Sequence, residues 1–228
     1  MDSEFIYWSH HTPIGIKVEE VEGHASISQT VWREMAIQIL CEHGKEGYRE
    51  IGHFKNGAPF IFGLEARISI THTEGLVAMA MLPRTPDMDL SIFNPRTAMG
   101  IDAERLNRAQ VVKLRERFLS ERELELIPAD DVKANILAWT CKEALYKAGM
   151  TEGLDWRRDI EILTLPEIDP SPVSKENREA SLYGNGLLRI KDERGEETVH
   201  EMLLYSYESS GCCVTIAHSP KCAKFSRK

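Results

Sequence analysis

The stretch from Asp131 to Gly149 is the clearest helix in the sequence and places the strongest constraint on the fold. At about 100° per residue, its small apolar side chains fall on one arc, which predicts a face packed against a core. The arc comprises Leu137, Ala138, Cys141, Ala144, Leu145 and Ala148. Trp139 and Tyr146 lie away from this arc, and a solvated face rarely carries two large aromatic residues. We therefore expect a second covered side, formed by packing between two halves of the protein or by a cleft wall.

Glu143 and Lys147 are four residues apart on the side of this helix away from the core arc. Residues at that spacing are neighbours on a helix surface, and an exposed pair of opposite charges contributes about 0.2–0.5 kcal/mol. A plain surface ion pair is one interpretation. Because the two charges lie beside aromatic residues on a side that we expect to be covered, a cleft wall is the other.

Asp102 and Glu104 belong to a short predicted strand. Side chains alternate between the faces of a strand, so the two acids share one face while Ile101 and Ala103 take the other. Gly100 leaves room beside the acids. Neighbouring carboxylates repel each other, and oxygen ligands of this kind suit a Mg²⁺ ion bound together with a phosphate substrate. The alternative is an exposed strand end with two solvated acids.

The stretch from Arg105 to Arg122 is basic, although the chain as a whole carries a net charge of −8. It contains six bases (Arg105, Arg108, Lys113, Arg115, Arg117 and Arg122) and two acids (Glu116 and Glu121). One interpretation is a solvated helix face, and the other is a docking surface for an acidic partner.

The composition is that of a globular protein, with 228 residues of which 42% are hydrophobic and 28% charged. The acidic net charge argues against general nucleic-acid affinity. The longest apolar run, 76–82, is too short to span a membrane, and the first twenty residues lack the apolar core of a signal peptide. No two of the five cysteines have metal-ligand spacing. We therefore expect a cytoplasmic protein with reduced cysteines and no membrane segment.

Further elements follow from periodicity and turn residues. We expect a hairpin formed by 6–8 and 14–18, a helix at 28–43, strands at 68–73, 76–82, 100–104, 160–165, 187–191, 199–207 and 213–218, and loops at 82–95 and 166–180. Two segments of the chain, Ile68-Ser-Ile-Thr-His72 and Val214-Thr-Ile-Ala-His218, are weakly similar in sequence, which hints at an internal duplication. Two similar halves would place a ligand cleft between them.

Four short stretches occur in a characteristic order: 69–73 (Ser-Ile-Thr-His-Thr), 100–104 (Gly-Ile-Asp-Ala-Glu), 118–123 (Phe-Leu-Ser-Glu-Arg-Glu) and 139–147 (Trp-Thr-Cys-Lys-Glu-Ala-Leu-Tyr-Lys). Together they resemble the motifs of the 4′-phosphopantetheinyl transferase superfamily, with a length closest to its surfactin-synthetase type. Each short motif alone is weak, whereas the ordered set makes a chance match improbable.

The resemblance implies that Asp102, Glu104 and Glu143 bind Mg²⁺. It also implies transfer of the 4′-phosphopantetheine arm of coenzyme A to a serine of an acyl or peptidyl carrier protein, with release of adenosine 3′,5′-bisphosphate. The carrier would be small and acidic, and would dock through the stretch from Arg105 to Arg122.

The resemblance further implies that Thr71, His72 and Lys147 contact the coenzyme A phosphates, with Lys147 also taking part in catalysis. Either Glu123 or Glu143 would be the base that deprotonates the serine. Two departures concern the coenzyme: Ala58 stands where the family usually has a lysine, and Arg33 is only a weak candidate for the 3′-phosphate.

The expected fold is α+β, with two similar halves related by pseudo-two-fold symmetry, each a helix packed on a small antiparallel sheet. The halves would be 1–98 on the coenzyme A side and 99–219 with the metal site, followed by a tail at 220–228. A monomer is expected from the length. Two rival functions are a non-catalytic coenzyme A or carrier-binding protein of the same fold, and a metal-dependent phosphohydrolase.

Overall fold

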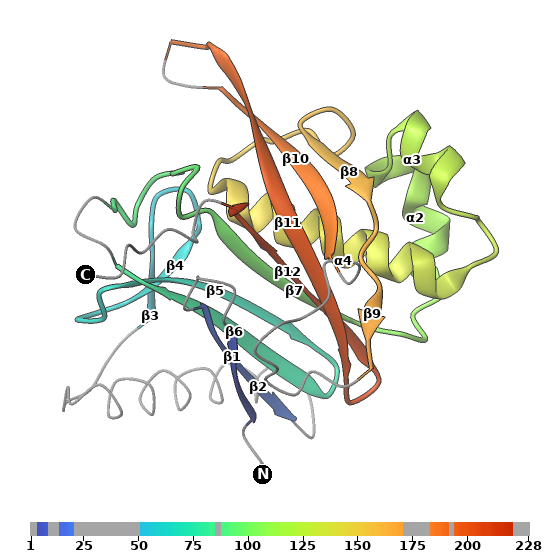
Figure 1. Ribbon diagram of the computed structural model, residues 1–228, viewed down its shortest axis with the longest axis horizontal. Coiled ribbons are helices and arrows are strands. Elements are labelled where there is room, and N and C mark those ends of the chain that lie inside the picture. Colours follow the sequence, from blue (N-terminus) through green and yellow to red (C-terminus); the bar gives the residue numbers. More distant parts are fainter. Residues whose placement is uncertain are drawn as a thin grey trace.

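The computed structural model describes residues 4–8, 14–20, 51–84, 88–170, 183–191 and 194–220. Within these ranges the protein consists of an antiparallel sheet, a second sheet that is antiparallel apart from one short parallel strand, a small separate hairpin and three helices (Figure 1). The helix expected at 28–43, including Arg33, lies outside the described residues, as does most of the tail.

The first sheet is antiparallel and has the strand order β1-β2-β6-β5. Its strands are β1 (Glu4–Trp8), β2 (Ile14–Glu20), β5 (Ala66–Thr73) and β6 (Leu76–Pro83). Thr73 pairs with Leu76, which leaves a two-residue turn in which Gly75 has a φ of 81°. Glycine accepts positive φ without strain, so it suits this turn. The predicted N-terminal hairpin and the predicted strand pair are both confirmed.

The second sheet has the order β7-β12-β11-β10-β8, and β9 is added beside β11. Its strands are β7 (Met99–Arg105), β8 (Ile160–Thr164), β9 (Ile168–Asp169), β10 (Tyr183–Lys191), β11 (Glu197–Ser209) and β12 (Cys212–His218). The prediction of an uninterrupted loop at 166–180 is wrong, because β9 pairs in parallel with β11. The sequence analysis also missed a two-stranded hairpin, formed by β3 (Ile51–His53) and β4 (Pro59–Ile61).

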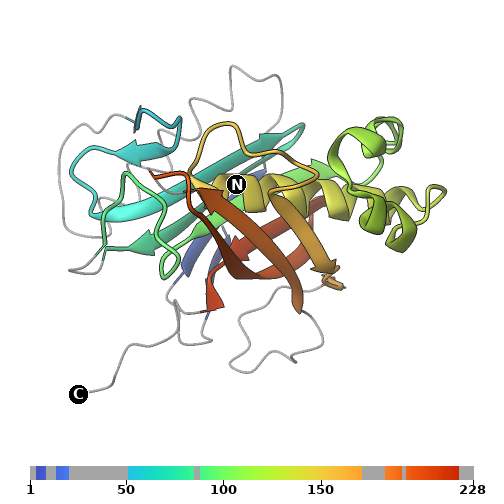
Figure 2. The same ribbon diagram turned by 90° about the horizontal axis from the view of Figure 1, so that it is seen from above.

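The described helices all follow β7 in the chain: α2 (Gln110–Phe118), α3 (Glu121–Leu126) and α4 (Val132–Gly149). The predicted start of α4 is confirmed by its N-cap, where the Asp131 side chain accepts a hydrogen bond from the Ala134 N–H at 2.9 Å. The helix ends before Met150, which is left-handed with a φ of 46°. Figure 2 shows α4 lying along the second sheet, with α2 and α3 beyond its N-terminal end.

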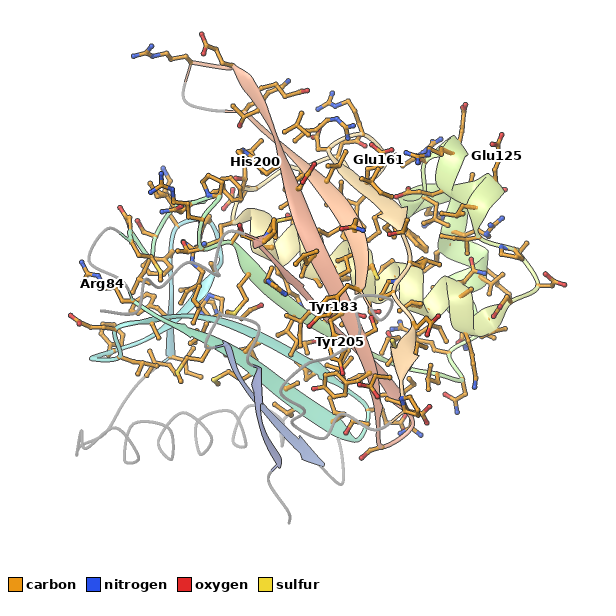
Figure 3. All side chains as sticks on the ribbon, viewed as in Figure 1. Arg84, Glu125, Glu161, Tyr183, His200 and Tyr205 are labelled. Carbon is orange, nitrogen blue, oxygen red and sulfur yellow. The ribbon has the colours of Figure 1, made fainter. Side chains whose placement is uncertain are left out.

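The core arc predicted for α4 is confirmed, because all six of its side chains are buried. They pack with the face of the second sheet that includes Cys213 and Ala217. The opposite face of that sheet packs against β6, through alternate residues such as Ile101 and Ala103. Tyr183 and Tyr205 contact each other on neighbouring strands β10 and β11, with ring centroids 5.7 Å apart (Figure 3).

The two sheets meet edge to edge where β5 runs beside β7. The Ile101 N–H donates to Ser69 Oγ at 3.0 Å, and the Ala103 N–H donates to Thr71 Oγ1 at 3.2 Å. Side-chain hydroxyls at alternate positions of β5 therefore satisfy backbone donors on the edge of β7. We call this contact the hydroxyl seam. It explains why hydroxyl residues alternate along 69–73, where only a phosphate-binding role was expected.

An α+β fold with helices packed on antiparallel sheets is confirmed. The sheets also divide along the chain, with the strands of the first sheet at 4–83 and those of the second at 99–218. The pseudo-two-fold symmetry stays a prediction, because the helix expected in the first half is not among the described residues. The domain boundaries likewise stay a prediction.

Candidate active site

The two acids of β7 lie on one face of a buried strand, as alternation predicts. Asp102 is 6% exposed and Glu104 is 4% exposed. The side chains of Ile101 and Ala103 on the other face enter the core between the sheets. The interpretation of these acids as a solvated strand end is therefore wrong, and burying them requires nearby compensation of their charge.

Gly100 allows α4 to approach this strand closely. A Cβ atom placed on Gly100 would lie 2.1 Å from the backbone oxygen of Ala144 and 2.6 Å from the backbone nitrogen of Ala148. No side chain fits at these distances, so the first residue of the 100–104 motif is required by helix packing. The close approach brings the side chains of α4 beside the carboxylates of β7.

Lys147 of α4 reaches across to β7. Its Nζ atom lies 2.8 Å from Asp102 Oδ1 and 3.0 Å from the backbone oxygen of Ile101. Its partner is therefore Asp102, and the expected surface ion pair with Glu143 is not found in the described part of the chain. Burial raises the pKa of Asp102, while the Lys147 charge and the Thr71 hydroxyl oppose that rise.

Glu143 lies half-buried on the same side of α4. Burial is the main cause that raises its pKa to about 7; the charges of Asp102 and Glu104 raise it too, and Lys147 opposes them. Charges interact this strongly only over short distances in a partly desolvated site. The three acids that were expected to act together therefore share one electrostatic environment, although they come from two elements about forty residues apart.

Two threonines of β5 complete the polar contacts of the acids. Thr71 Oγ1 donates to Asp102 Oδ1 at 2.9 Å, and Thr73 Oγ1 donates to Glu104 Oε1 at 3.0 Å. Thr71 thus lies in the site, as expected. His72 is exposed and, by strand alternation, points to the opposite face of β5 from Thr71. The structure does not bring His72 to the three acids.

Arg108 supplies a second cation. Its Nη1 atom contacts Glu104 Oε2, while Glu104 Oε1 also accepts the Arg105 N–H at 2.8 Å. Three carboxyl groups are thus accompanied by two basic side chains, Lys147 and Arg108. This contact joins two residues that are four apart in the chain, and it links the loop before α2 to the acids of β7.

The carboxylates suit Mg²⁺ in chemical type, since hard oxygen ligands are what this ion prefers. A divalent cation would also relieve the repulsion that contributes to the high pKa of Glu143. In the described part of the chain, however, no three acidic, histidine or cysteine side chains stand close enough to form a ready metal cage. Asp102 and Glu104 instead engage basic side chains. The three carboxyl groups fit the ion in chemical type. In this structure Asp102 contacts Lys147, and Glu104 contacts Arg108.

Comparison with known proteins identifies the part of the chain that contains these elements. Residues 98–191 match the 4′-phosphopantetheinyl transferase superfamily. This stretch is a 4′-phosphopantetheinyl transferase superfamily domain. It contains both strand acids, Glu143 and Lys147, whereas Thr71 and Thr73 lie before it. No curated protein matches the chain.

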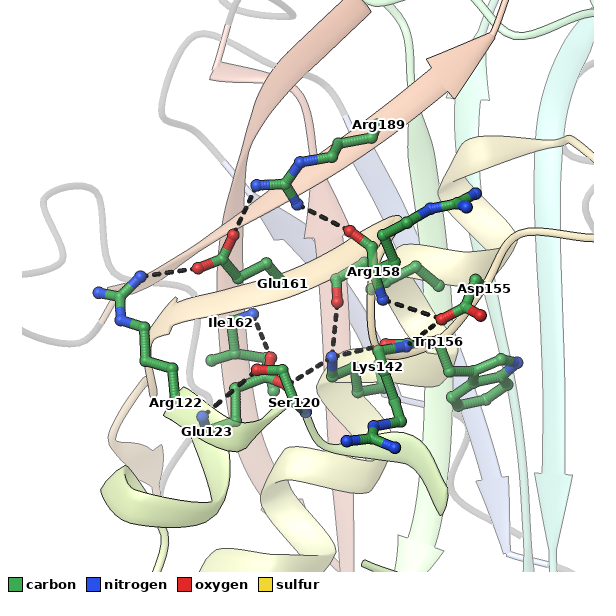
Figure 4. Close-up of polar contacts among 12 residues, drawn as sticks. Ser120, Arg122, Glu123, Lys142, Asp155, Trp156, Arg158, Glu161, Ile162 and Arg189 are labelled. Carbon is green, nitrogen blue, oxygen red and sulfur yellow. Dashed lines mark hydrogen bonds and ion pairs between the residues drawn. The ribbon is translucent and has the colours of Figure 1, made fainter. Parts of the chain in front are cut away.

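Glu123 takes part in a different arrangement within the transferase domain. It is fully buried, and its Oε2 atom lies 2.7 Å from Nζ of Lys142, which is fully buried as well (Figure 4). The same carboxylate accepts the backbone N–H of Ser120 at 2.7 Å and that of Ile162 at 2.6 Å. Its oxygens are occupied and have no access to solvent. This environment does not suit Glu123 to the role of serine base that the family resemblance implies.

Lys142 was missed as a structural residue by the sequence analysis. Its ammonium group also donates to the backbone oxygens of Trp156 at 2.8 Å and Ile160 at 2.6 Å (Figure 4). Burial lowers its pKa, while the Glu123 charge opposes that change. Ser120 and Glu123 form a capping box at the start of α3, so two stretches of the family pattern meet in one buried ion pair. The sequence signal was the capping-box spacing between Ser120 and Glu123.

The second covered side predicted for α4 is confirmed, but its cover comes from the same half. Trp156 stacks on Trp139 and Tyr146, with ring centroids 5.5 and 5.6 Å apart. Phe118 contacts Trp139 edge-on at 5.1 Å. The interpretation of these aromatic residues as packing between two halves is therefore wrong.

The basic stretch is only partly available to a partner. Arg115 donates to Asn135 Oδ1 and to backbone oxygens at the end of α3, which makes it a structural clamp between the helices. Arg122 pairs with Glu161 at 2.7 Å. Lys113 and Arg117 are exposed, one turn apart on α2, and form no ion pair within the described ranges.

The turn that carries Ala58 is anchored close to the end of α4. Asn56 donates to the backbone oxygen of Met150 at 2.7 Å and to that of Ser91 at 3.1 Å. The turn is therefore held in place without a lysine at position 58. None of the helices in the described residues is long and apolar enough to cross a membrane.

Proposed function

We propose that this protein transfers the 4′-phosphopantetheine arm of coenzyme A to a serine of an acyl or peptidyl carrier protein. The superfamily domain supports phosphopantetheinyl transfer in general. The observation that supports the specific proposal is the contact of Lys147 with Asp102, together with the influence of Asp102, Glu104 and Lys147 on the pKa of Glu143. A reaction that breaks a pyrophosphate depends on positioning and on neutralising negative charge.

Magnesium would be held by Asp102, Glu104 and Glu143, and would supply positive charge to the pyrophosphate. The side chain of Lys147 is 28% exposed, so its ammonium group can also turn toward a phosphate. Thr71 orients Asp102 through its hydroxyl group. The released product would be adenosine 3′,5′-bisphosphate.

We propose that Glu143 is the base that takes the proton of the carrier serine. A general base must lie within hydrogen-bond reach of the proton that it accepts, and a half-buried carboxylate can reach an incoming hydroxyl group. Glu143 is half-buried and, in the described part of the chain, makes no hydrogen bond or ion pair. Glu123 has neither property, because it is enclosed with Lys142. The assignment predicts that Glu143→Gln lowers kcat strongly, whereas Glu123→Gln keeps the kcat of the molecules that remain folded.

The carrier would dock on α2 through Lys113 and Arg117, a narrower surface than the whole stretch from Arg105 to Arg122. Complementary charge accelerates the association of such partners and weakens with salt. Reversing both charges should raise KM for the carrier and leave KM for coenzyme A unchanged. Each single reversal, Lys113→Glu or Arg117→Glu, is compared with Arg157→Glu, which makes the same charge change at an exposed residue outside α2.

The direct test incubates the full chain with apo carrier proteins, coenzyme A and Mg²⁺, followed by mass spectrometry of the carrier. A mass gain equal to the phosphopantetheine arm on a single serine supports the proposal. Binding of coenzyme A with no gain on a panel of fatty-acid, polyketide and peptide carriers would favour a non-catalytic binding protein. Phosphate release without any carrier would favour a phosphohydrolase.

A further inference from the structure

Arg108 is placed unlike the other bases of its stretch. Its guanidinium group contacts the nearly buried Glu104 although its own side chain is 50% exposed. The side chain of the neighbouring Arg105 is directed instead to the backbone oxygen of Glu74, at 3.4 Å, and to Cys212. Arg108 is therefore a solvent-facing cation whose charged end reaches the acid cluster.

The contact leaves Glu104 with no unused oxygen. Oε2 faces Arg108, and Oε1 accepts both the Thr73 hydroxyl and the Arg105 N–H. A cation that binds Oε2 would share this oxygen with Arg108, and two positive groups on one oxygen repel each other. Arg108 differs in this respect from Thr73, which is neutral and could remain hydrogen-bonded to a metal-bound carboxylate.

The same cluster is incompletely neutralised. Lys147 and Arg108 provide two positive charges for the three carboxyl groups of Asp102, Glu104 and Glu143. The site thus attracts a further cation while Arg108 occupies one of the oxygens that such a cation would use. Arg108 therefore already contacts the Glu104 oxygen that a further cation would bind.

We propose that Arg108 is a tethered counter-ion that competes with the divalent cation for Glu104. When the metal binds, the guanidinium group leaves the carboxylate and turns to solvent beside the basic helix α2. Metal loading would thereby present one more positive charge to an acidic carrier. The inference rests on the magnesium site of the proposed function and goes beyond it by coupling that site to the partner surface.

The test measures Mn²⁺ affinity of the full chain by electron paramagnetic resonance of the free ion, without coenzyme A or carrier. Arg108→Gln should bind Mn²⁺ about 2- to 5-fold more tightly than the wild type, which lies within the range expected for removing a partly exposed ion pair. Arg108→Lys should remain close to the wild type, because the competing charge is kept.

Arg105→Gln is the matched control, since it removes an equal charge from a neighbouring residue that does not contact Glu104 through its side chain. It should change Mn²⁺ affinity less than twofold. In a Glu104→Gln background, Arg108→Gln should give no gain, because the contested carboxylate is absent. Circular dichroism and the unfolding midpoint establish that each variant is folded.

Three outcomes overturn the inference. Equal gains for Arg108→Gln and Arg105→Gln would mean that only general charge is involved. Unchanged affinity in Arg108→Gln would mean that Arg108 does not compete; if transfer to a carrier still needs Mg²⁺, the proposed function then stands without the coupling. Failure of Mn²⁺ to bind any variant would overturn both the inference and the magnesium site.

Discussion

The buried ion pair between Glu123 and Lys142 permits a quantitative prediction. Lys142→Met removes a fully buried ammonium group that contacts Glu123 and two backbone oxygens. The remaining carboxylate keeps its two backbone donors but loses its counter-charge. Breaking a buried pair from one side typically costs about 3–5 kcal/mol. We expect that loss, a large share of the roughly 5–15 kcal/mol that stabilises an ordinary domain.

The reciprocal change, Glu123→Gln, leaves Lys142 buried without an opposite charge, and we expect a similar loss. The double variant leaves no unpaired charge in the site. It should therefore be more stable than the sum of the two single losses predicts, by at least about 2 kcal/mol. The control is Arg122→Gln, which breaks an exposed pair with Glu161 and should cost less than about 1 kcal/mol.

Urea denaturation, followed by circular dichroism and fluorescence, measures the free energy of unfolding for each variant. Losses that add within about 0.5 kcal/mol would refute the reasoning, because they would show that the two groups are not coupled. The same Glu123→Gln protein, assayed for transfer under conditions where it is folded, would contradict our assignment of the base if its kcat fell as far as that of Glu143→Gln.

Three further changes test other parts of the structure. Gly100→Ala puts a methyl group 2.1 Å from a backbone oxygen of α4, so we expect a loss of at least about 1–3 kcal/mol in urea denaturation together with a loss of transfer. Trp156→Leu removes two stacking contacts of 5.5 and 5.6 Å; a midpoint equal to that of the wild type would show that these contacts do not stabilise the protein. The hydrogen bond from Arg189, aided by Arg122, lowers the pKa of Glu161 below 4.5. The stability that this charge contributes is therefore present above pH 4.5 and lost as the pH falls through the lowered pKa. Glu161→Gln should be less stable than the wild type at pH 7, and the difference should disappear once the pH is below the lowered pKa.

The sequence predicted α4 and the faces of β7 well, because both depend on local periodicity. Every apolar residue of the α4 arc is buried, and Asp102 and Glu104 share a face. The two-residue strand β9 was missed because Ile168 and Asp169 carry no alternation that distinguishes them from a loop. Its existence depends on pairing with β11, a contact that no local pattern encodes.

The site was harder to predict where the partners are distant in the chain. Lys142 stands next to Glu143, and nothing local indicates that one is buried with Glu123 while the other faces the acid cluster. The family resemblance pointed to Glu123, Glu143 and Lys147 together but could not separate those beside the strand acids from the one that holds elements together. Arg115 illustrates the same limit, since its charge suggested docking and its contacts are internal.

The hydroxyl seam also affects the tendency of mutant proteins to aggregate. Ser69 and Thr71 act as acceptors for a strand edge that would otherwise display bare amide groups. Unsatisfied strand edges recruit strands from other molecules, which is a route to aggregation. Loss of the Ser69 oxygen, which accepts the Ile101 N–H, should therefore reduce the yield of dispersed protein during expression.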